Sequence, residues 1–128
     1  MTEWKDDSRK SQVTIRQLLS LSSGIDGGVN GSPPMYRRAV ALAEATGEPG
    51  KQFSYGPIPF QCFGELVRRK LAARNESVEA YLKRRVFDPI GLKVGFWRKD
   101  REGNLSLPGG ASLTAREWAK FGELVRLG

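Results

Sequence analysis

Apolar residues recur along much of this chain at three- and four-residue intervals, the spacing of one face of a helix. The clearest example is the set Phe60, Phe63, Val67 and Leu71. The pattern predicts helices from about residue 14 to 22, 32 to 47, 60 to 75, 77 to 86, and from 114 onward. A short strand is expected at 94–97, and proline-rich or glycine-rich segments such as 53–59 are expected to be loops. The predicted fold class is therefore mainly α.

Polar residues stand where the predicted helices begin. Thr14 with Gln17 and Thr114 with Glu117 have the spacing of a capping box, and Ser77 is placed to cap the fourth helix. Ser32 is expected to cap the second helix, with Pro33 at its first position. Gly24 is expected to end the first helix in the left-handed conformation.

Length and composition are those of one globular domain. The chain has 128 residues, of which 39% are hydrophobic, and no apolar run approaches the roughly 20 residues of a membrane span. Residues 1–12 are expected to form an exposed lead-in. Their charged sequence has no apolar core of the signal-peptide kind, so it indicates no compartment.

Two residue types limit the chemistry. The chain has no histidine, which excludes a Ser-His-Asp triad or a His-ligated metal within it, and its single cysteine excludes an internal disulfide. Cys62 is expected to be a buried small hydrophobe. We expect neither a metal ion nor any other cofactor.

The net charge of +7 is concentrated between Arg68 and Arg85, where seven basic residues stand against two acidic ones. No aromatic or glycine pattern of a nucleic-acid module accompanies this charge, so no nucleic-acid partner is expected. One hypothesis is a stand-alone helical module that binds a protein or an anionic partner through this basic face. Such a module should close its own core.

Four segments together indicate a different class of protein. VTIRQLLSLSSGID (13–26) resembles the T-x-R-x-L-L-x-x-x-S-G helix of class C beta-lactamase-like serine hydrolases, a family of beta-lactamases, D-alanyl-D-alanine peptidases, esterases and amide hydrolases. FSYGPIPFQCFGELVRRKL (53–71), VEAYLKRRVFDPIGL (78–92) and LPGGASLTAREWAKFGELVRLG (107–128) are similar to later segments of the family, in the same order. The resemblance implies the helical subdomain of the α/β beta-lactamase/transpeptidase-like fold, without most of its sheet domain.

The resemblance also implies site residues. Tyr55 stands at the family's catalytic tyrosine, which works with a lysine as general base toward the nucleophilic serine. A phenol, with an ordinary pKa of about 10, needs a nearby cation for this role at neutral pH. The alternative is that Tyr55 only packs at a loop corner. Expected cleft-lining residues are Pro57, Gly109, Gly110, Ala111 and Ser112, although the two glycines fit a simple turn equally well.

Two positions depart from the family pattern. Pro57 replaces the usual asparagine, and a proline side chain cannot hydrogen-bond a substrate amide. This change points away from beta-lactams and toward the esterase or amidase branches. Glu117 replaces the usual aspartate and keeps its capping function.

The family's nucleophile motif is missing. No lysine of this chain has a serine three residues before it, and no K-T-G or H-T-G is present. In the family these motifs lie before residue 13 and well after residue 112, which places them outside these residues. We therefore expect the middle part of a hydrolase that acts on a small ester, amide or peptide through a serine acyl-enzyme. Alone it should be inactive, marginally stable and prone to self-association.

Overall fold

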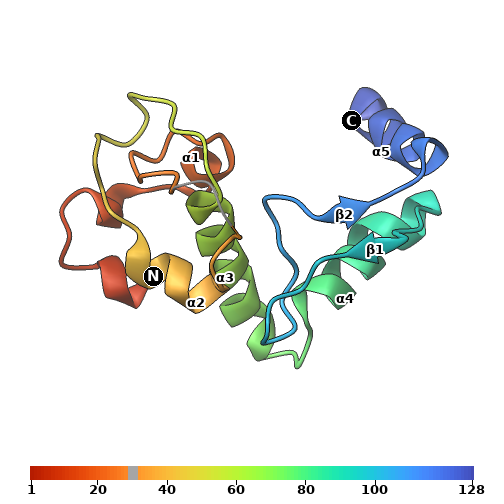
Figure 1. The fold of residues 1–128 in the computed structure, drawn as a ribbon, viewed down its shortest axis with the longest axis horizontal. Coiled ribbons are helices and arrows are strands. Elements are labelled where there is room, and N and C mark those ends of the chain that lie inside the picture. The colour runs from red at the N-terminus through yellow and green to blue at the C-terminus, as the bar shows by residue number, and fades with distance from the viewer. Residues whose placement is uncertain (29–31) are drawn as a thin grey trace.

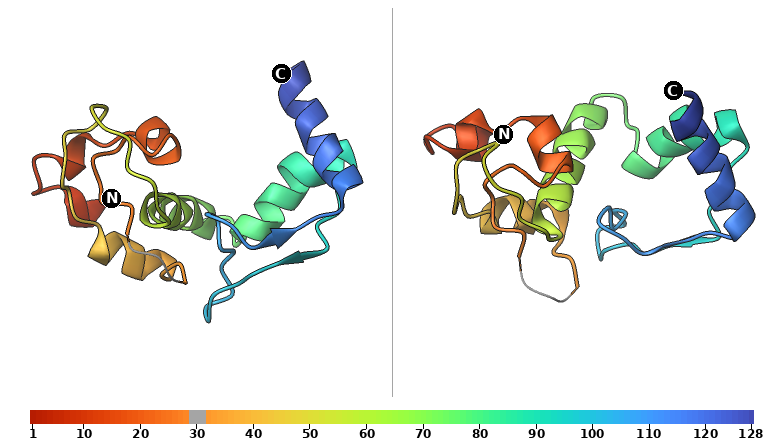
Figure 2. Two further views of the ribbon diagram at one scale, coloured as in Figure 1. Left: turned by 45° about the horizontal axis from the view of Figure 1, so that its top comes forward. Right: turned by 90° about the horizontal axis from the view of Figure 1, so that it is seen from above.

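A computed structural model describes residues 1–28 and 32–128 and shows two halves that are joined at one end (Figure 1). The first half, residues 1–72, contains α1 (Ile15–Leu19), α2 (Tyr36–Leu42) and α3 (Ile58–Ala72), with short 3-10 helices at Thr2–Trp4 and Lys10–Gln12. The second half, residues 78–127, contains α4 (Val78–Leu82), a π-helical turn (Lys83–Phe87), a 3-10 turn (Asp88–Ile90), β1 (Phe96–Trp97), β2 (Ala111–Ser112) and α5 (Ala115–Leu127). Two further views show the halves diverging from the end of α3 (Figure 2). The described fold is mainly α, as predicted.

The first half has its own core, built mainly where α2 crosses α3. Eight buried residues form it: Trp4, Leu18, Ile25, Ala39, Val40, Ala43, Ile58 and Cys62. Tyr36 and Gly64 bring the two helices close together, because a Cβ on Gly64 would lie only 2.5 Å from Cζ of the Tyr36 ring. The sequence at position 64 therefore sets how closely α3 packs on α2.

Residues 1–12 differ from the expected lead-in at Trp4. Most of this segment is exposed, but Trp4 is 5% exposed and its indole Nε1 donates to the carbonyl of Val40 at 3.3 Å. Burying a large aromatic ring stabilises the fold when its N–H can form a hydrogen bond. The segment is thus anchored to α2.

The predicted caps hold where they depend on local spacing. Thr14 forms the complete capping box with Gln17, and Ser77 accepts from the N–H of Ala80. At Thr114 only half of the predicted box forms: Thr114 accepts from the N–H of Glu117, but the Glu117 carboxylate bonds Lys93 and Lys120 and does not cap the helix. Ser32 does not cap a helix: α2 begins only at Tyr36, because the residues before Pro33 and Pro34 are biased away from helical geometry.

Gly24 has the predicted left-handed conformation, with φ 73°, but it does not end the first helix. That helix ends at Leu19, and Leu21 takes the left-handed conformation, with φ 55°. Gly24 instead permits contact with a second loop, since a Cβ there would lie 2.3 Å from the carbonyl oxygen of Gly47. The N–H groups of Thr46 and Gly47 both donate to the Gly24 carbonyl.

A charge cluster fastens the N-terminal segment to α3. Glu65 is fully buried and accepts from Nε of Arg68 and Nε of Arg69, each at 2.7 Å. Arg69 also donates to Glu3 at 2.6 Å. Burial alone would raise the pKa of Glu65, but the hydrogen bonds and charges of the two arginines outweigh it and hold that pKa below its ordinary value. The hydrogen bond from Arg69 lowers the pKa of Glu3 from 4.5 to about 2.

This cluster predicts acid sensitivity. The pKa of Glu3 is lower in the folded protein than its ordinary value. Its contribution to the free energy of unfolding is therefore present above pH 4.5 and is lost as the pH falls toward 2. Glu3 is partly exposed, so we expect Glu3→Gln to lower the free energy of unfolding by at most about 1 kcal/mol at pH 6. The difference from wild type should shrink as the pH falls toward 2, where about half of the Glu3 carboxyls become protonated. Thermal unfolding followed by circular dichroism at pH 6, 4 and 2 measures it, and a difference that does not change with pH would contradict the assignment.

The second half is a hairpin flanked by helices. β1 pairs antiparallel with β2, so that Phe96 faces Ser112 and Trp97 faces Ala111. The carboxylate of Glu117 in α5 accepts from the backbone N–H of Lys93 at 2.6 Å, and Lys120 donates to the carbonyl of Gly91. These bonds attach the start of α5 to the segment before β1.

Candidate functional site

The backbone around Tyr55 is held by an unusually close contact between two loops. A Cβ on Gly56 would lie 2.0 Å from the carbonyl oxygen of Gly27, so only glycine allows this approach. The same carbonyl accepts from the N–H of Ile58 at 3.1 Å, and the N–H of Gly27 donates to Oγ of Ser54 at 3.2 Å. Tyr55 therefore lies on a segment fixed on both sides.

The side chain of Tyr55 points away from this support. It is 79% exposed, the largest exposed fraction among the large hydrophobic residues that are exposed in the described structure. A tyrosine that only packed at a loop corner would bury its ring. Tyr55 thus combines a fixed backbone with an exposed phenol.

Pro57 lies at the end of the same loop and caps the start of α3. Its carbonyl accepts from the N–H of Gln61 at 3.1 Å, the first bond of that helix. The pyrrolidine ring is half-buried and presents no hydrogen-bonding group. A substrate beside Tyr55 would thus meet an apolar surface at this position.

The other predicted residues lie in the second half of the molecule. Gly109 follows a turn in which its N–H donates to the carbonyl of Ser106, and Gly110 has φ +94°. Ala111 and Ser112 form β2. The glycines therefore do form a turn, and a Cβ on Gly110 would press on Arg98 at 2.9 Å. Figure 1 shows β2 in the second half, across from the loop that precedes α3.

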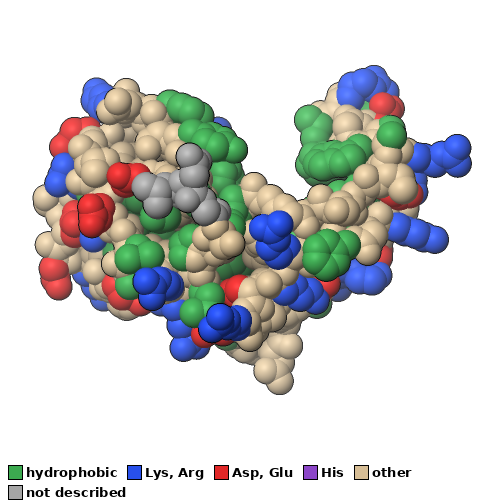
Figure 3. Space-filling view, in the orientation of Figure 1, with side chains coloured by type: hydrophobic (Ala, Val, Ile, Leu, Met, Phe, Trp, Pro, Cys, Tyr) green, Lys and Arg blue, Asp and Glu red, His purple; other side chains and the backbone are tan. Residues whose placement is uncertain are grey.

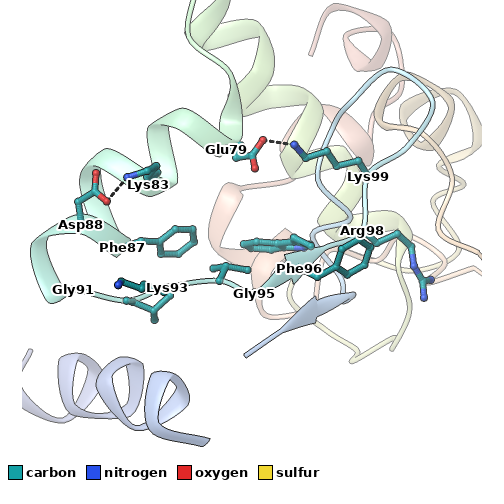
Figure 4. A pocket seen from close by; sticks show the side chains of 13 residues that line it. Glu79, Lys83, Phe87, Asp88, Gly91, Lys93, Gly95, Phe96, Arg98 and Lys99 are labelled. Carbon is teal, nitrogen blue, oxygen red and sulfur yellow. Dashed lines mark hydrogen bonds and ion pairs between the residues drawn. The ribbon is translucent and has the colours of Figure 1, made fainter. Parts of the chain in front are cut away.

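The described residues also form a cavity of about 930 Å³ between α4, the turn that follows it, and β1 (Figure 4). Phe87 and Trp97 lie in its wall with ring centroids 6.1 Å apart. Glu79 pairs with Lys99 at 2.6 Å, and Lys83 pairs with Asp88 at 2.5 Å. None of the six predicted site residues is among the described residues that line it.

The remaining reactive groups offer no catalytic centre within the described residues. Cys62 is fully buried in the first core, and burial raises the pKa of its thiol to about 12, so it stays protonated at neutral pH. Among the described residues, no group of three or more histidine, cysteine or acidic side chains is arranged to hold a metal ion.

No helix in the described part of the chain is long and apolar enough to cross a membrane.

Sequence reasoning missed two features that shape the site. One is the cavity, whose lining residues all come from the stretch 79–99 and enclose a space only because that stretch folds back on itself. The other is Gln61, a polar residue on the apolar side of α3 that is only 2% exposed. The signal for Gln61 was present, because it stands between Phe60, Cys62 and Phe63, where a polar side chain needs a buried partner.

Comparisons with known proteins agree with this architecture. The model of the beta-lactamase family matches residues 3–124. The crystal structure of a putative beta-lactamase from Bacteroides dorei DSM 17855 superposes with a TM-score of 0.70 at 21% sequence identity, over 97% of this chain and 39% of that one. No curated protein matches the sequence. Because the family match extends over nearly the whole chain and a similar fold accompanies it, this chain belongs to the beta-lactamase family.

Proposed function

We propose that this chain is the mostly helical part of a serine hydrolase, the helical subdomain of the beta-lactamase/transpeptidase-like fold, and that it supplies one wall of the active-site cleft. The chain spans 39% of the similar solved structure, so the rest of the cleft would come from segments outside these residues. The exposure of Tyr55 on its fixed backbone is the observation that carries this proposal.

The proposed chemistry is acyl transfer to a serine. The serine and lysine of an S-x-x-K motif would face Tyr55, and the lysine ammonium would favour the tyrosine phenolate. Tyr55 would take the serine proton as the hydroxyl attacks the substrate carbonyl, and would pass it to the alcohol or amine that leaves as the acyl-enzyme forms. Water would later release the acyl group as a carboxylic acid. These 128 residues contain no S-x-x-K and would be inactive alone.

Pro57 supports a choice of substrate class. An amide-recognising asparagine would hydrogen-bond a beta-lactam or peptide, whereas proline leaves that interaction unmade. A small ester loses less from this change, because it has no amide N–H to satisfy. We therefore propose an ester, or an amide bound without this contact, as the substrate.

Exposed apolar side chains support this proposal over the stand-alone basic module. The chain exposes 8471 Å², about a quarter more than the roughly 6,800 Å² expected of a compact 14.2 kDa monomer. Figure 3 shows hydrophobic side chains on both walls of the notch between the halves. In the basic segment, Arg68, Arg69, Lys83 and Arg84 are already paired with acidic residues.

The test begins with the DNA on both sides of this coding sequence. The complete reading frame should encode S-x-x-K upstream and K-T-G or H-T-G downstream. The expressed protein should hydrolyse p-nitrophenyl butyrate faster than the beta-lactam nitrocefin, and mass spectrometry should find the trapped acyl group on the serine of that motif. A reading frame without S-x-x-K, or an acyl group on another residue, would overturn the proposal.

The apolar face of α5 predicts self-association of the isolated chain. Trp118 is 54% exposed and Val125 67% exposed, and α5 buries none of its residues. We expect sedimentation velocity to show species larger than a monomer at tens of micromolar protein. Replacing Trp118 and Phe121 together by serine should shift the chain toward monomer. Serine at exposed Lys5 and Arg101 is the control and should leave the distribution unchanged. A monomer at all concentrations would contradict this prediction.

A further inference from the structure

One buried amide joins the two halves of the molecule. Gln61 lies in the first turns of α3 and is 2% exposed. Its Nε2 donates to the carbonyl of Pro34 at 2.6 Å, and its Oε1 accepts from the N–H of Leu107 at 3.3 Å. Both polar atoms of the side chain are therefore used, each by a different loop.

The chemistry of these partners fixes which way the amide faces. A backbone carbonyl only accepts and a backbone N–H only donates, so the side chain cannot be turned over without losing both bonds. Three segments meet here: the loop before α2, the start of α3, and the segment that leads from the hairpin turn to β2. Figure 1 shows this last segment passing beside α3.

A second buried bond strengthens the same junction. The hydroxyl of Tyr36, which is fully buried, donates to the carbonyl of Leu105 at 2.7 Å. Leu107 packs against the small cluster of Tyr36, Leu71 and Val78. The segment 105–107 is thus held to α2 by Tyr36 and to α3 by Gln61.

This junction lies between the two groups of candidate cleft residues. Tyr55 and Pro57 come directly before α3, and Gln61 is one helical turn after Pro57. Gly109–Ser112 begin two residues after Leu107. A displacement of Leu107 relative to Gln61 would therefore move one group against the other.

We propose that Gln61 is a positioning residue, whose amide sets the placement of Gly109–Ser112 relative to Tyr55. This inference rests on the proposed function for its effect on catalysis, but the placement can be measured without any activity.

Two substitutions separate hydrogen bonding from packing. Gln61→Met has a similar shape but can bond neither partner, so the carbonyl of Pro34 and the N–H of Leu107 lose their contacts. Gln61→Glu keeps both bonds only while its carboxyl is protonated, because an ionised carboxylate cannot donate to a carbonyl. The glutamate variant should therefore behave like wild type at low pH and like the methionine variant at high pH.

The experiment measures the distance between spin labels on the two halves. Cysteines placed at the exposed positions Arg16 in α1 and Arg116 in α5 carry the labels, and buried Cys62 should not react. Proteins that carry only one of the two labels are measured as well, because any distance they show must arise between separate copies of the chain. Val40→Ala, which removes methyl groups from the first core without touching the junction, is the matched control.

We expect a narrow distance distribution for wild type and Val40→Ala, and a broader or shifted one for Gln61→Met. Gln61→Glu should change from narrow to broad as the pH is raised from 5 to 9. Wild type keeps Glu65 and the other native charged groups but lacks a carboxyl at position 61, so its distribution should not change. Distributions identical to wild type in both Gln61 variants would overturn the positioning role, whether or not the complete enzyme is active.

The complete enzyme provides the second readout. Gln61→Met should lower kcat for an ester about 10- to 100-fold with KM changed less than about threefold, because misplaced groups slow the chemical step. Val40→Ala should leave both constants near wild type. An unchanged kcat together with a changed label distance would overturn the link to catalysis. If wild-type enzyme is inactive, the proposed function fails, and the label distances alone decide the role of Gln61.

Discussion

Replacing Tyr55 by phenylalanine in the complete enzyme should lower kcat/KM for ester hydrolysis by about 10²- to 10⁴-fold. The substitution removes only the hydroxyl, the one group of this side chain that can accept the serine proton. The ring is 79% exposed, so the change should disturb little packing. Stability should therefore stay within about 0.5 kcal/mol of wild type. Steady-state kinetics and the rate of acyl-enzyme formation measure the effect.

A second tyrosine provides the control. Tyr81 lies in α4, in the other half of the molecule, where the guanidinium of Arg84 is 5.8 Å from its ring centroid. Tyr81→Phe also removes one phenol hydroxyl but keeps this ring, and it should leave kcat/KM unchanged. An equal loss in both variants would indicate a general effect on folding, and full activity in Tyr55→Phe would remove the tyrosine from the mechanism.

The features that could be predicted from the sequence are those governed by short-range spacing. Thr14, Ser77 and Thr114 cap helices because a hydroxyl can reach an N–H two or three residues later wherever the chain turns helical. Periodic apolar residues likewise located α3 to within a few residues. The family resemblance was equally local, carried by four segments, and the family match supports it.

The features that could not be predicted depend on partners far away in sequence. Trp4 is buried because the carbonyl of Val40 accepts its indole N–H. Gln61 is buried because Pro34 and Leu107, from separate loops, complete its hydrogen bonds. A residue's type states what it can bond, whereas the fold decides whether a partner is present.

The close contact beneath Tyr55 predicts the largest loss of stability. Gly56→Ala places a methyl group 2.0 Å from the carbonyl oxygen of Gly27 and 2.2 Å from its carbonyl carbon, and both of these atoms belong to the backbone. That oxygen cannot move away without cost, because it accepts a hydrogen bond from the N–H of Ile58. We expect the free energy of unfolding to fall by about 3 kcal/mol or more, a large share of the stability of a domain this size. Urea unfolding followed by circular dichroism measures it.

Gly109→Ala is the matched control for this prediction. A Cβ on Gly109 would meet no described atom within 4 Å, and its φ lies outside the left-handed region, so alanine there should change stability by less than about 0.5 kcal/mol. Gly27→Ala should repeat the loss, since its Cβ would lie 2.1 Å from the carbonyl oxygen of Tyr55. Wild-type stability in both Gly56→Ala and Gly27→Ala would mean that these loops do not pack against each other. Tyr55 would then lack the fixed backbone on which a role as general base depends.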